Sequence, residues 1–171
     1  MVSAMDVLRA PWRMEYIESP KSVSHETECI FCKYARETQD AENLILARGE
    51  KAFVILNRYP YSSGHLMVVP YRHEHRIEFL ERDEYCEMFA LAQNSVRVLR
   101  KAMNADGFNL GINLGKVAGA GIDAHLHLHV VPRWNGDINF MSVTAETKVL
   151  PEALGKTRER LLQTWVQLSS F

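Results

Sequence analysis

The spacing of hydrophobic and polar positions along the chain predicts which segments form strands and which form helices. Short apolar runs over residues 44–47, 52–57 and 65–69 are bounded by turn residues and predict three strands. Two later runs, over 108–114 and 125–133, flank a glycine-rich loop and predict two more strands. All five lie within one stretch of about ninety residues, so a single sheet is expected.

Helical spacing begins at Tyr85, where apolar residues start to recur every three or four positions. This pattern predicts a helix with one buried face, ended by Gly107. Its expected buried residues are Tyr85, Met88, Phe89, Ala92, Val96, Leu99 and Met103. A last helix should begin near Pro151, which suits a first helical turn. Its expected buried residues are Leu154, Leu161, Leu162, Trp165 and Leu168.

This order of elements favours the α+β class. Strands that follow one another, with one long inserted helix and one C-terminal helix, are typical of a largely antiparallel sheet. The chain has no internal repeat and no linker, and its first part is irregular in pattern. We therefore expect one domain over 42–171, preceded by an N-terminal segment over 1–41.

Composition narrows the possible partners. The chain has 171 residues, 47% hydrophobic and 24% charged, which is typical of a globular domain. Its formal net charge of −1 gives no overall basic field and argues against a DNA- or RNA-binding module. It has no apolar stretch near the roughly 20 residues that span a bilayer and no secretory signal pattern. We expect a cytoplasmic protein that binds no nucleic acid and no membrane.

The three cysteines form no even disulfide framework. Cys29 and Cys32 have the spacing of a zinc knuckle. The same spacing occurs in redox motifs, but the βαβ pattern expected there is missing. Cys86 lies beside the apolar stripe of the predicted helix and is expected to be a small packed residue.

Three histidines occupy alternate positions in the apolar strand predicted over 125–133. Successive side chains of a strand point to opposite faces, so His125, His127 and His129 should share one face. Burying an imidazole without a partner costs about 1–3 kcal/mol. The histidine face is therefore expected to meet a polar cleft, a metal or a phosphate. Histidines at i and i+2 also bind catalytic zinc, and a nucleotide-binding protein without activity is a further alternative.

The segment His-Leu-His-Leu-His-Val-Val at 125–131 resembles the signature of the histidine triad (HIT) superfamily. Residues 53–73 resemble that family's nucleotide-binding hairpin, and 111–121 resemble its phosphate loop. The continuation Val-Val-Pro-Arg-Trp and the Gly-Asp-x-Asn-Phe segment at 136–140 are similar to bacterial diadenosine tetraphosphate phosphorylases. The resemblance covers roughly 42–165 and implies a HIT-like fold.

The resemblance also implies roles for individual residues. His127 would attack the α-phosphorus and form a nucleotidyl-histidine intermediate, while His65 and His129 would donate hydrogen bonds to phosphate, partly as imidazolium. Asn57 matches a ribose-binding position and Asn113 a phosphate-binding position. Three further residues are expected to bind substrate, the loop glycines through backbone N–H groups and the tryptophan by stacking on a base unless it simply packs: Gly119, Gly121 and Trp134.

A structural zinc site is implied on the same grounds. Family members that carry the cysteine pair add two histidines as ligands, which here correspond to His73 and His125, with His75 as a nearby competitor for His73. Cys29 and Cys32 would complete a closed Cys₂His₂ site. No redox cofactor is implied.

The implied reaction is cleavage of a dinucleoside polyphosphate at the α-phosphate. With inorganic phosphate as acceptor, diadenosine tetraphosphate would give ADP and ATP. With water as acceptor, a dinucleoside polyphosphate or a nucleoside phosphoramidate would release AMP. The resemblance over 125–140 favours phosphate as the acceptor. Water is kept as the alternative, because Ala120 and Gly121 offer no side-chain donor where many family members have one. The resemblance also implies a homodimer in which two sheets join edge to edge.

Overall fold

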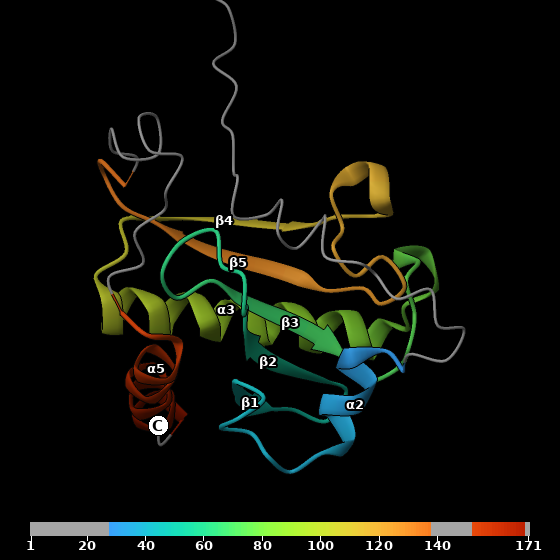
Figure 1. The fold of residues 1–171 in the computed structure, drawn as a ribbon, viewed down its shortest axis with the longest axis horizontal. Coiled ribbons are helices and arrows are strands. Elements are labelled where there is room, and N and C mark those ends of the chain that lie inside the picture. Colours follow the sequence, from blue (N-terminus) through green and yellow to red (C-terminus); the bar gives the residue numbers. More distant parts are fainter. Residues whose placement is uncertain (1–27, 138–151, 170–171) are drawn as a thin grey trace, which may run out of the picture.

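The computed structural model describes residues 28–137 and 152–169. Its five strands form one sheet (Figure 1) and are β1 (Ile45–Arg48), β2 (Ala52–Leu56), β3 (Leu66–Pro70), β4 (Gly107–Ile112) and β5 (Leu128–Arg133). Its helices are α2 (Ile30–Arg36), α3 (Arg82–Met103) and α5 (Leu154–Ser169), with 3-10 turns at Ile77–Phe79 and Lys116–Ala118. The predicted α+β class is confirmed, and no helix in the described part of the chain is long and apolar enough to cross a membrane.

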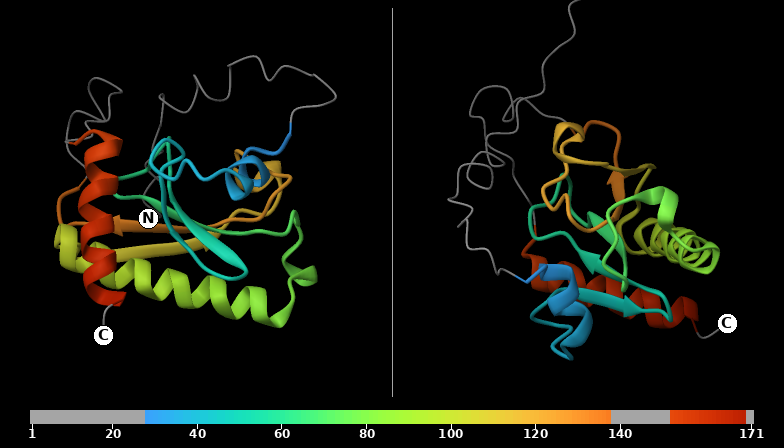
Figure 2. Two further views of the ribbon diagram at one scale, coloured as in Figure 1. Left: turned by 90° about the horizontal axis from the view of Figure 1, so that it is seen from below. Right: turned by 90° about the vertical axis from the view of Figure 1, so that its right-hand side faces the viewer.

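The sheet is antiparallel throughout, in the order β1-β2-β3-β5-β4. Paired residues on neighbouring strands share a face. One transverse row runs through Ile55, Met67 and His129, and the adjacent row runs through Val54, Val68 and Leu128. The second row is buried beneath α3, which contacts β2, β3 and β5. The first row therefore faces the other side of the sheet, where α2 lies (Figure 2).

Helix α3 corrects part of the predicted core. Met88, Ala92 and Leu99 are buried as expected, but Tyr85 and Phe89 are 51% and 50% exposed, so these two assignments were wrong. The buried stripe instead passes through two polar residues, Glu84 and Ser95. Glu84 pairs with an arginine and Ser95 donates to a carbonyl of its own helix, so both are satisfied without an apolar partner. Cys86 is exposed rather than packed.

Both ends of α3 differ from the prediction. A reciprocal capping box between Glu81 and Glu84 starts the helix at Arg82. Asn104 ends it in the left-handed conformation, so Gly107 already belongs to β4.

Helix α5 packs on α3 and β1. Leu161 is fully buried and Leu154, Leu162 and Trp165 pack at the edge of the core, whereas Leu168 is 37% exposed, contrary to expectation. Helix α5 begins at Leu154, and Pro151 lies outside the described residues.

The strand that carries the histidines is shorter than predicted. Strand β5 begins at Leu128, and the preceding residues form a bend in which the Leu126 N–H donates to the Glu74 carbonyl oxygen. His125 and His127 therefore precede the ladder, but Phe31 of α2 contacts both rings, so they lie on the same side of the sheet as His129. Helix α2, which lies inside the N-terminal segment expected over 1–41, was also missed.

Gly64 precedes His65 and occupies a position that only glycine fits. Its φ is +77°, and a Cβ there would lie 2.6 Å from Met103 Sδ and 2.9 Å from Leu99 Cδ2. We expect Gly64→Ala to lower the free energy of unfolding by about 2 kcal/mol, because backbone strain and close contact act together. Urea denaturation measures the change. Gly107→Ala is the matched control, since a Cβ there meets nothing within 4 Å; equal losses in the two variants would contradict the argument.

Candidate functional site

A cavity of about 320 Å³ opens on the face of the sheet opposite α3. Its floor is the row Ile55, Met67 and His129, beside His127. The remaining lining comes from α2, the segment before β1, the β2–β3 loop and the glycine-rich loop. Its size is that of a small-molecule site. The lining residues include one arginine, Arg58, and no carboxylate, so the cavity favours an anion.

His127 is held in one tautomer by the backbone. Its Nδ1 lies 2.9 Å from the carbonyl oxygen of His125, and a carbonyl only accepts hydrogen bonds. Nδ1 must therefore carry the proton, which leaves the lone pair on Nε2. The ring is 5% exposed and lines the cavity. Burial lowers the pKa of His127 below its usual value of 6.5, which favours the neutral ring. A neutral imidazole with an oriented lone pair is suited to nucleophilic attack.

His65 and His129 form a directed chain of hydrogen bonds. The Tyr61 N–H donates to His65 Nδ1 at 3.0 Å, and the Asn57 amide lies 3.3 Å from the same atom. Because Nδ1 accepts, the proton of His65 is on Nε2, which donates to His129 Nδ1 at 2.9 Å. His129 in turn carries its proton on Nε2. The rings of His127 and His129 lie 4.8 Å apart, so the cavity contains a lone pair beside a proton donor.

The same chain places His65 away from the cavity. His65 is fully buried and is not among the residues that line the cavity, and its Nε2 reaches His129 instead. A second proton on His65 would be on Nδ1, which accepts a hydrogen bond from the Tyr61 N–H. Two N–H groups would then point at each other. The geometry therefore favours neutral donors over the imidazolium expected from the sequence.

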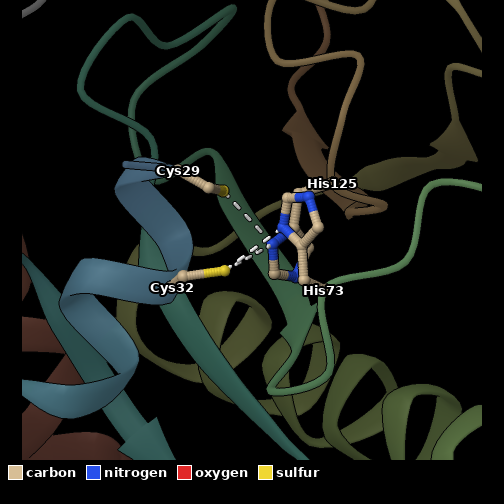
Figure 3. A group of neighbouring side chains, drawn as sticks. All are labelled: Cys29, Cys32, His73 and His125. Carbon is tan, nitrogen blue, oxygen red and sulfur yellow. Dashed lines mark hydrogen bonds between the residues drawn. The ribbon is translucent and has the colours of Figure 1, made fainter. Parts of the chain in front are cut away.

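His125 belongs to a cluster with Cys29, Cys32 and His73 (Figure 3). The four ligand atoms all lie within 4.8 Å of one another. His125 Nδ1 is 3.3 Å from Cys29 Sγ and 3.6 Å from Cys32 Sγ, and His73 Nδ1 is 3.2 Å from Cys32 Sγ. His75 instead faces the Glu74 carboxylate, so the structure selects His73 of the two candidates.

The cluster fits a tetrahedral metal ion. With Zn–S near 2.3 Å and Zn–N near 2.0 Å, sulfur and nitrogen ligands of a tetrahedron lie about 3.5 Å apart. His125 Nε2 donates to the Pro70 carbonyl oxygen at 2.9 Å, which leaves Nδ1 as the ligand atom. Burial lowers the pKa of His125 to about 4, so the ring is neutral as a ligand requires. Burial and Cys29 raise the pKa of Cys32 to about 11, so a cation is needed to hold its thiolate.

The alternative of a zinc site made from the three histidines has no geometric support. His125 directs its ligand nitrogen to the cysteines, His127 bonds a carbonyl, and His129 bonds His65. In the described parts of the chain, Cys29, Cys32, His73 and His125 form the one metal-binding group found.

Other expected substrate-binding residues divide between the cavity and its surroundings. Asn57, Gly119 and Gly121 line the cavity. Asn113 is half-buried just beyond β4, and Trp134 donates its indole N–H to the Met103 carbonyl oxygen; neither is among the lining residues. Trp134 thus takes the packing role at the end of α3.

Several lining residues were missed by sequence reasoning. Phe31 and Tyr34 on α2, and Arg58 and Tyr61 after β2, belong to the cavity wall. Residues 30–36 are apolar at Ile30, Phe31 and Tyr34, a spacing that one helical turn would explain, but the run is too short to stand out. Cys32 within this run, together with Cys29 just before it, points to metal binding and not to a cavity wall.

The C-terminal end of α2 is fixed by Arg48 on β1. The guanidinium donates to the carbonyl oxygens of Tyr34, Ala35 and Glu37 at 3.0, 2.9 and 2.7 Å, and to the Asp40 carboxylate. Arg48 thus satisfies carbonyls that a helix terminus leaves unpaired. This contact is independent of the metal cluster at the other end of the helix.

Comparisons with known proteins identify the family of this chain. The HIT domain family model matches residues 38–136. AP-4-A phosphorylase of Mycobacterium tuberculosis is 40% identical over 164 residues, covering 94% of this chain and 84% of the relative. Bis(5'-adenosyl)-triphosphatase of Dictyostelium discoideum is 33% identical over 84 residues, 49% of this chain and 56% of the relative.

A solved structure is similar over most of the chain. The Zn-bound histidine triad family protein of Mycobacterium smegmatis superimposes with a TM-score of 0.68 at 29% identity, covering 84% of this chain and 96% of that one. The matched region holds the histidine strand, the cavity floor and the glycine-rich loop, and the chain belongs to the HIT domain family.

Proposed function

We propose that this HIT-family enzyme is a nucleotidyltransferase that cleaves dinucleoside polyphosphates, with diadenosine tetraphosphate as substrate and inorganic phosphate as acceptor. One observation carries the proposal: His127, fixed as a neutral ring with its lone pair on Nε2, lines the cavity beside the Nε2–H of His129. The 40% identity to an AP-4-A phosphorylase over nearly the whole chain supports the substrate class.

In the first half-reaction, His127 Nε2 attacks the α-phosphorus. The bond from that phosphorus to the bridging oxygen breaks, its electron pair leaves with ATP, and adenylyl-His127 remains. The His129 N–H is placed to donate to a phosphate oxygen as charge develops there. Backbone N–H groups of Gly119 and Gly121 and the cation of Arg58 offer further stabilisation of a polyphosphate.

In the second half-reaction, an oxygen of inorganic phosphate attacks adenylyl-His127 and forms ADP, which restores the free imidazole. Cys29, Cys32, His73 and His125 would hold a structural Zn²⁺ that takes no part in either step. Its contribution is to fix the bend from which the His125 carbonyl orients the nucleophile.

Product analysis tests the proposal. Diadenosine tetraphosphate is incubated with the protein with and without phosphate, and the nucleotides are separated chromatographically. ADP and ATP that form only with phosphate would support phosphorolysis. AMP and ATP that form regardless of phosphate would assign water as the acceptor. An absence of turnover in both conditions would contradict the substrate class and redirect the search to phosphoramidates.

The rate of the first half-reaction should depend on the protonation of His127. Burial lowers its pKa below 6.5, so the ring stays neutral as the pH falls through 6.5 and protonates only at lower pH. We therefore expect kcat/KM for the dinucleotide to fall as the pH is lowered, with a midpoint below pH 6.5. In a two-step mechanism this ratio describes the first half-reaction alone, so the protonation of the acceptor phosphate does not affect it. Metal content is measured at each pH as a control, and a midpoint at or above 6.5 would contradict the prediction.

The homodimer and the cytoplasmic location belong to the same proposal. Strand β4 is an edge of the sheet, and its Leu110 is 46% exposed, which suits edge-to-edge pairing of two copies. Light scattering of the purified protein tests this, with Leu110→Lys expected to give the monomer. The cytoplasm is reducing, as thiolate ligands at Cys29 and Cys32 require.

A further inference from the structure

Helix α2 touches the metal cluster with one face and the cavity with another. Cys29 and Cys32 are three residues apart and reach the cluster, while Phe31 and Tyr34 are also three residues apart and line the cavity. The view in Figure 3 shows both cysteines at the start of the helix, directed at His125 and His73. One short element therefore separates a metal site from a ligand site.

Phe31 makes the contacts that join these two sites. Its ring is 2% exposed and lies 5.5 Å from the His125 ring in an edge-on arrangement and 5.4 Å from the His127 ring. The same side chain lines the cavity. Phe31 is thus the shared aromatic neighbour of a metal ligand, the nucleophile and the cavity wall. A shift of its ring would change the packing at all three.

The position of Phe31 depends on what fixes the start of α2. The helix has seven residues, and Cys29 at its N-cap makes no capping side-chain hydrogen bond. A helix of this length is not stable alone and relies on tertiary contacts. Arg48 fixes the far end, beyond Tyr34, by its bonds to carbonyls. At the near end, where Phe31 lies, the metal cluster is the corresponding attachment.

The geometry points to Phe31 as a positioning residue that couples metal binding to nucleotide binding. This inference rests on the proposed function, since it takes a nucleotide as the ligand of the cavity. When the metal leaves, the start of α2 is released, Phe31 no longer fixes the wall beside His127, and nucleotide affinity falls. Coupling between two sites is reciprocal, so a bound nucleotide must retain the metal more tightly by the same factor.

The test measures AMP binding by calorimetry to zinc-loaded and chelator-stripped full-length protein. In the wild type we expect stripping to raise the Kd for AMP by about tenfold, within the usual range of site-to-site coupling. In Phe31→Leu, the loaded protein should already bind AMP more weakly, and stripping should change its Kd by less than about twofold. Phe53→Leu is the matched control, because Phe53 is an equally buried core phenylalanine outside the cavity lining. It should keep the wild-type tenfold effect.

A second measurement uses only folded, loaded protein. Zinc retention is titrated against a chromophoric chelator with and without saturating AMP. In the wild type and in Phe53→Leu, AMP should strengthen zinc retention by the same factor by which zinc strengthens AMP binding. In Phe31→Leu, AMP should not change zinc retention. The coupling alone would be overturned if the Kd for AMP did not depend on zinc, or if removal of zinc changed this Kd equally in Phe31→Leu and the wild type. Loaded wild-type protein that binds no AMP would overturn both the coupling and the proposed function.

Discussion

Replacing His127 by alanine is expected to lower kcat on diadenosine tetraphosphate by about 10⁴-fold or more, as removal of a covalent nucleophile does in other enzymes. The reason is local. The substitution removes the Nε2 lone pair, while the His65–His129 chain and the rest of the cavity wall keep their own partners. The measurement is turnover by product chromatography at saturating substrate, with AMP affinity determined in parallel.

The parallel binding measurement separates chemistry from folding. His127→Ala should bind AMP within a few-fold of the wild type, because the floor and the α2 wall remain. His75→Ala is the matched control, since His75 is exposed, lies two residues from His73 in sequence and faces the Glu74 carboxylate. It should keep wild-type turnover. A His127→Ala protein that retains more than about 1% of the activity would show that another group forms the intermediate.

A covalent intermediate can also be sought directly. Wild-type protein mixed with substrate in the absence of phosphate and quenched should carry an adenylyl group on the peptide with His127, and His127→Ala should not. Added phosphate should discharge the group as ADP. An adduct on His129 instead would reverse the roles that the hydrogen bonds assign to the two rings.

The sequence predicted the order of the five strands, α3 and α5 because each has a clear apolar pattern, but it missed the short helix α2. Strands β1 to β3 pair as simple neighbours, and their apolar runs agree with the structure to within one or two residues. The predicted ends of α3 differ from the observed ones by a few residues, and its buried face was predicted only in part, since periodicity cannot tell that Glu84 and Ser95 find partners in the interior. The two aromatic residues counted as core lie on the surface instead.

The histidines show where pattern reasoning fails at a site. Alternation placed His125, His127 and His129 on one face, yet their surroundings give them three roles. His125 precedes β5 and contacts Cys29 and Cys32, which are far away in sequence. Only the resemblance to a family suggested this division, since no local spacing in 125–129 distinguishes the first ring from the others. The tautomers depend on Pro70 and Tyr61, which no motif identifies as partners.

Loss of the metal cluster is expected to be the largest single loss of stability. Cys32→Ser removes one of four ligands, and we expect the free energy of unfolding to fall by about 4 kcal/mol in zinc-containing buffer, as is typical when a structural metal is lost. Urea denaturation measures the change, and metal analysis of protein purified without chelator should give one zinc per wild-type chain. Cys86→Ser is the matched control because Cys86 is exposed and outside the cluster, and it should change stability by less than about 0.5 kcal/mol.

Chelation distinguishes the loss of metal from the loss of packing. If the metal provides the stability, a chelator should destabilise the wild type and Cys86→Ser but leave Cys32→Ser unchanged, so that all three unfold at nearly the same urea concentration once stripped. The stripped wild type is weakened because its cluster then holds two half-buried thiols beside the buried His125 ring, and the pKa of Cys32, raised to about 11, disfavours any thiolate there. A Cys32→Ser protein that is equally destabilised with and without chelator relative to the wild type would instead assign the effect to the side chain itself.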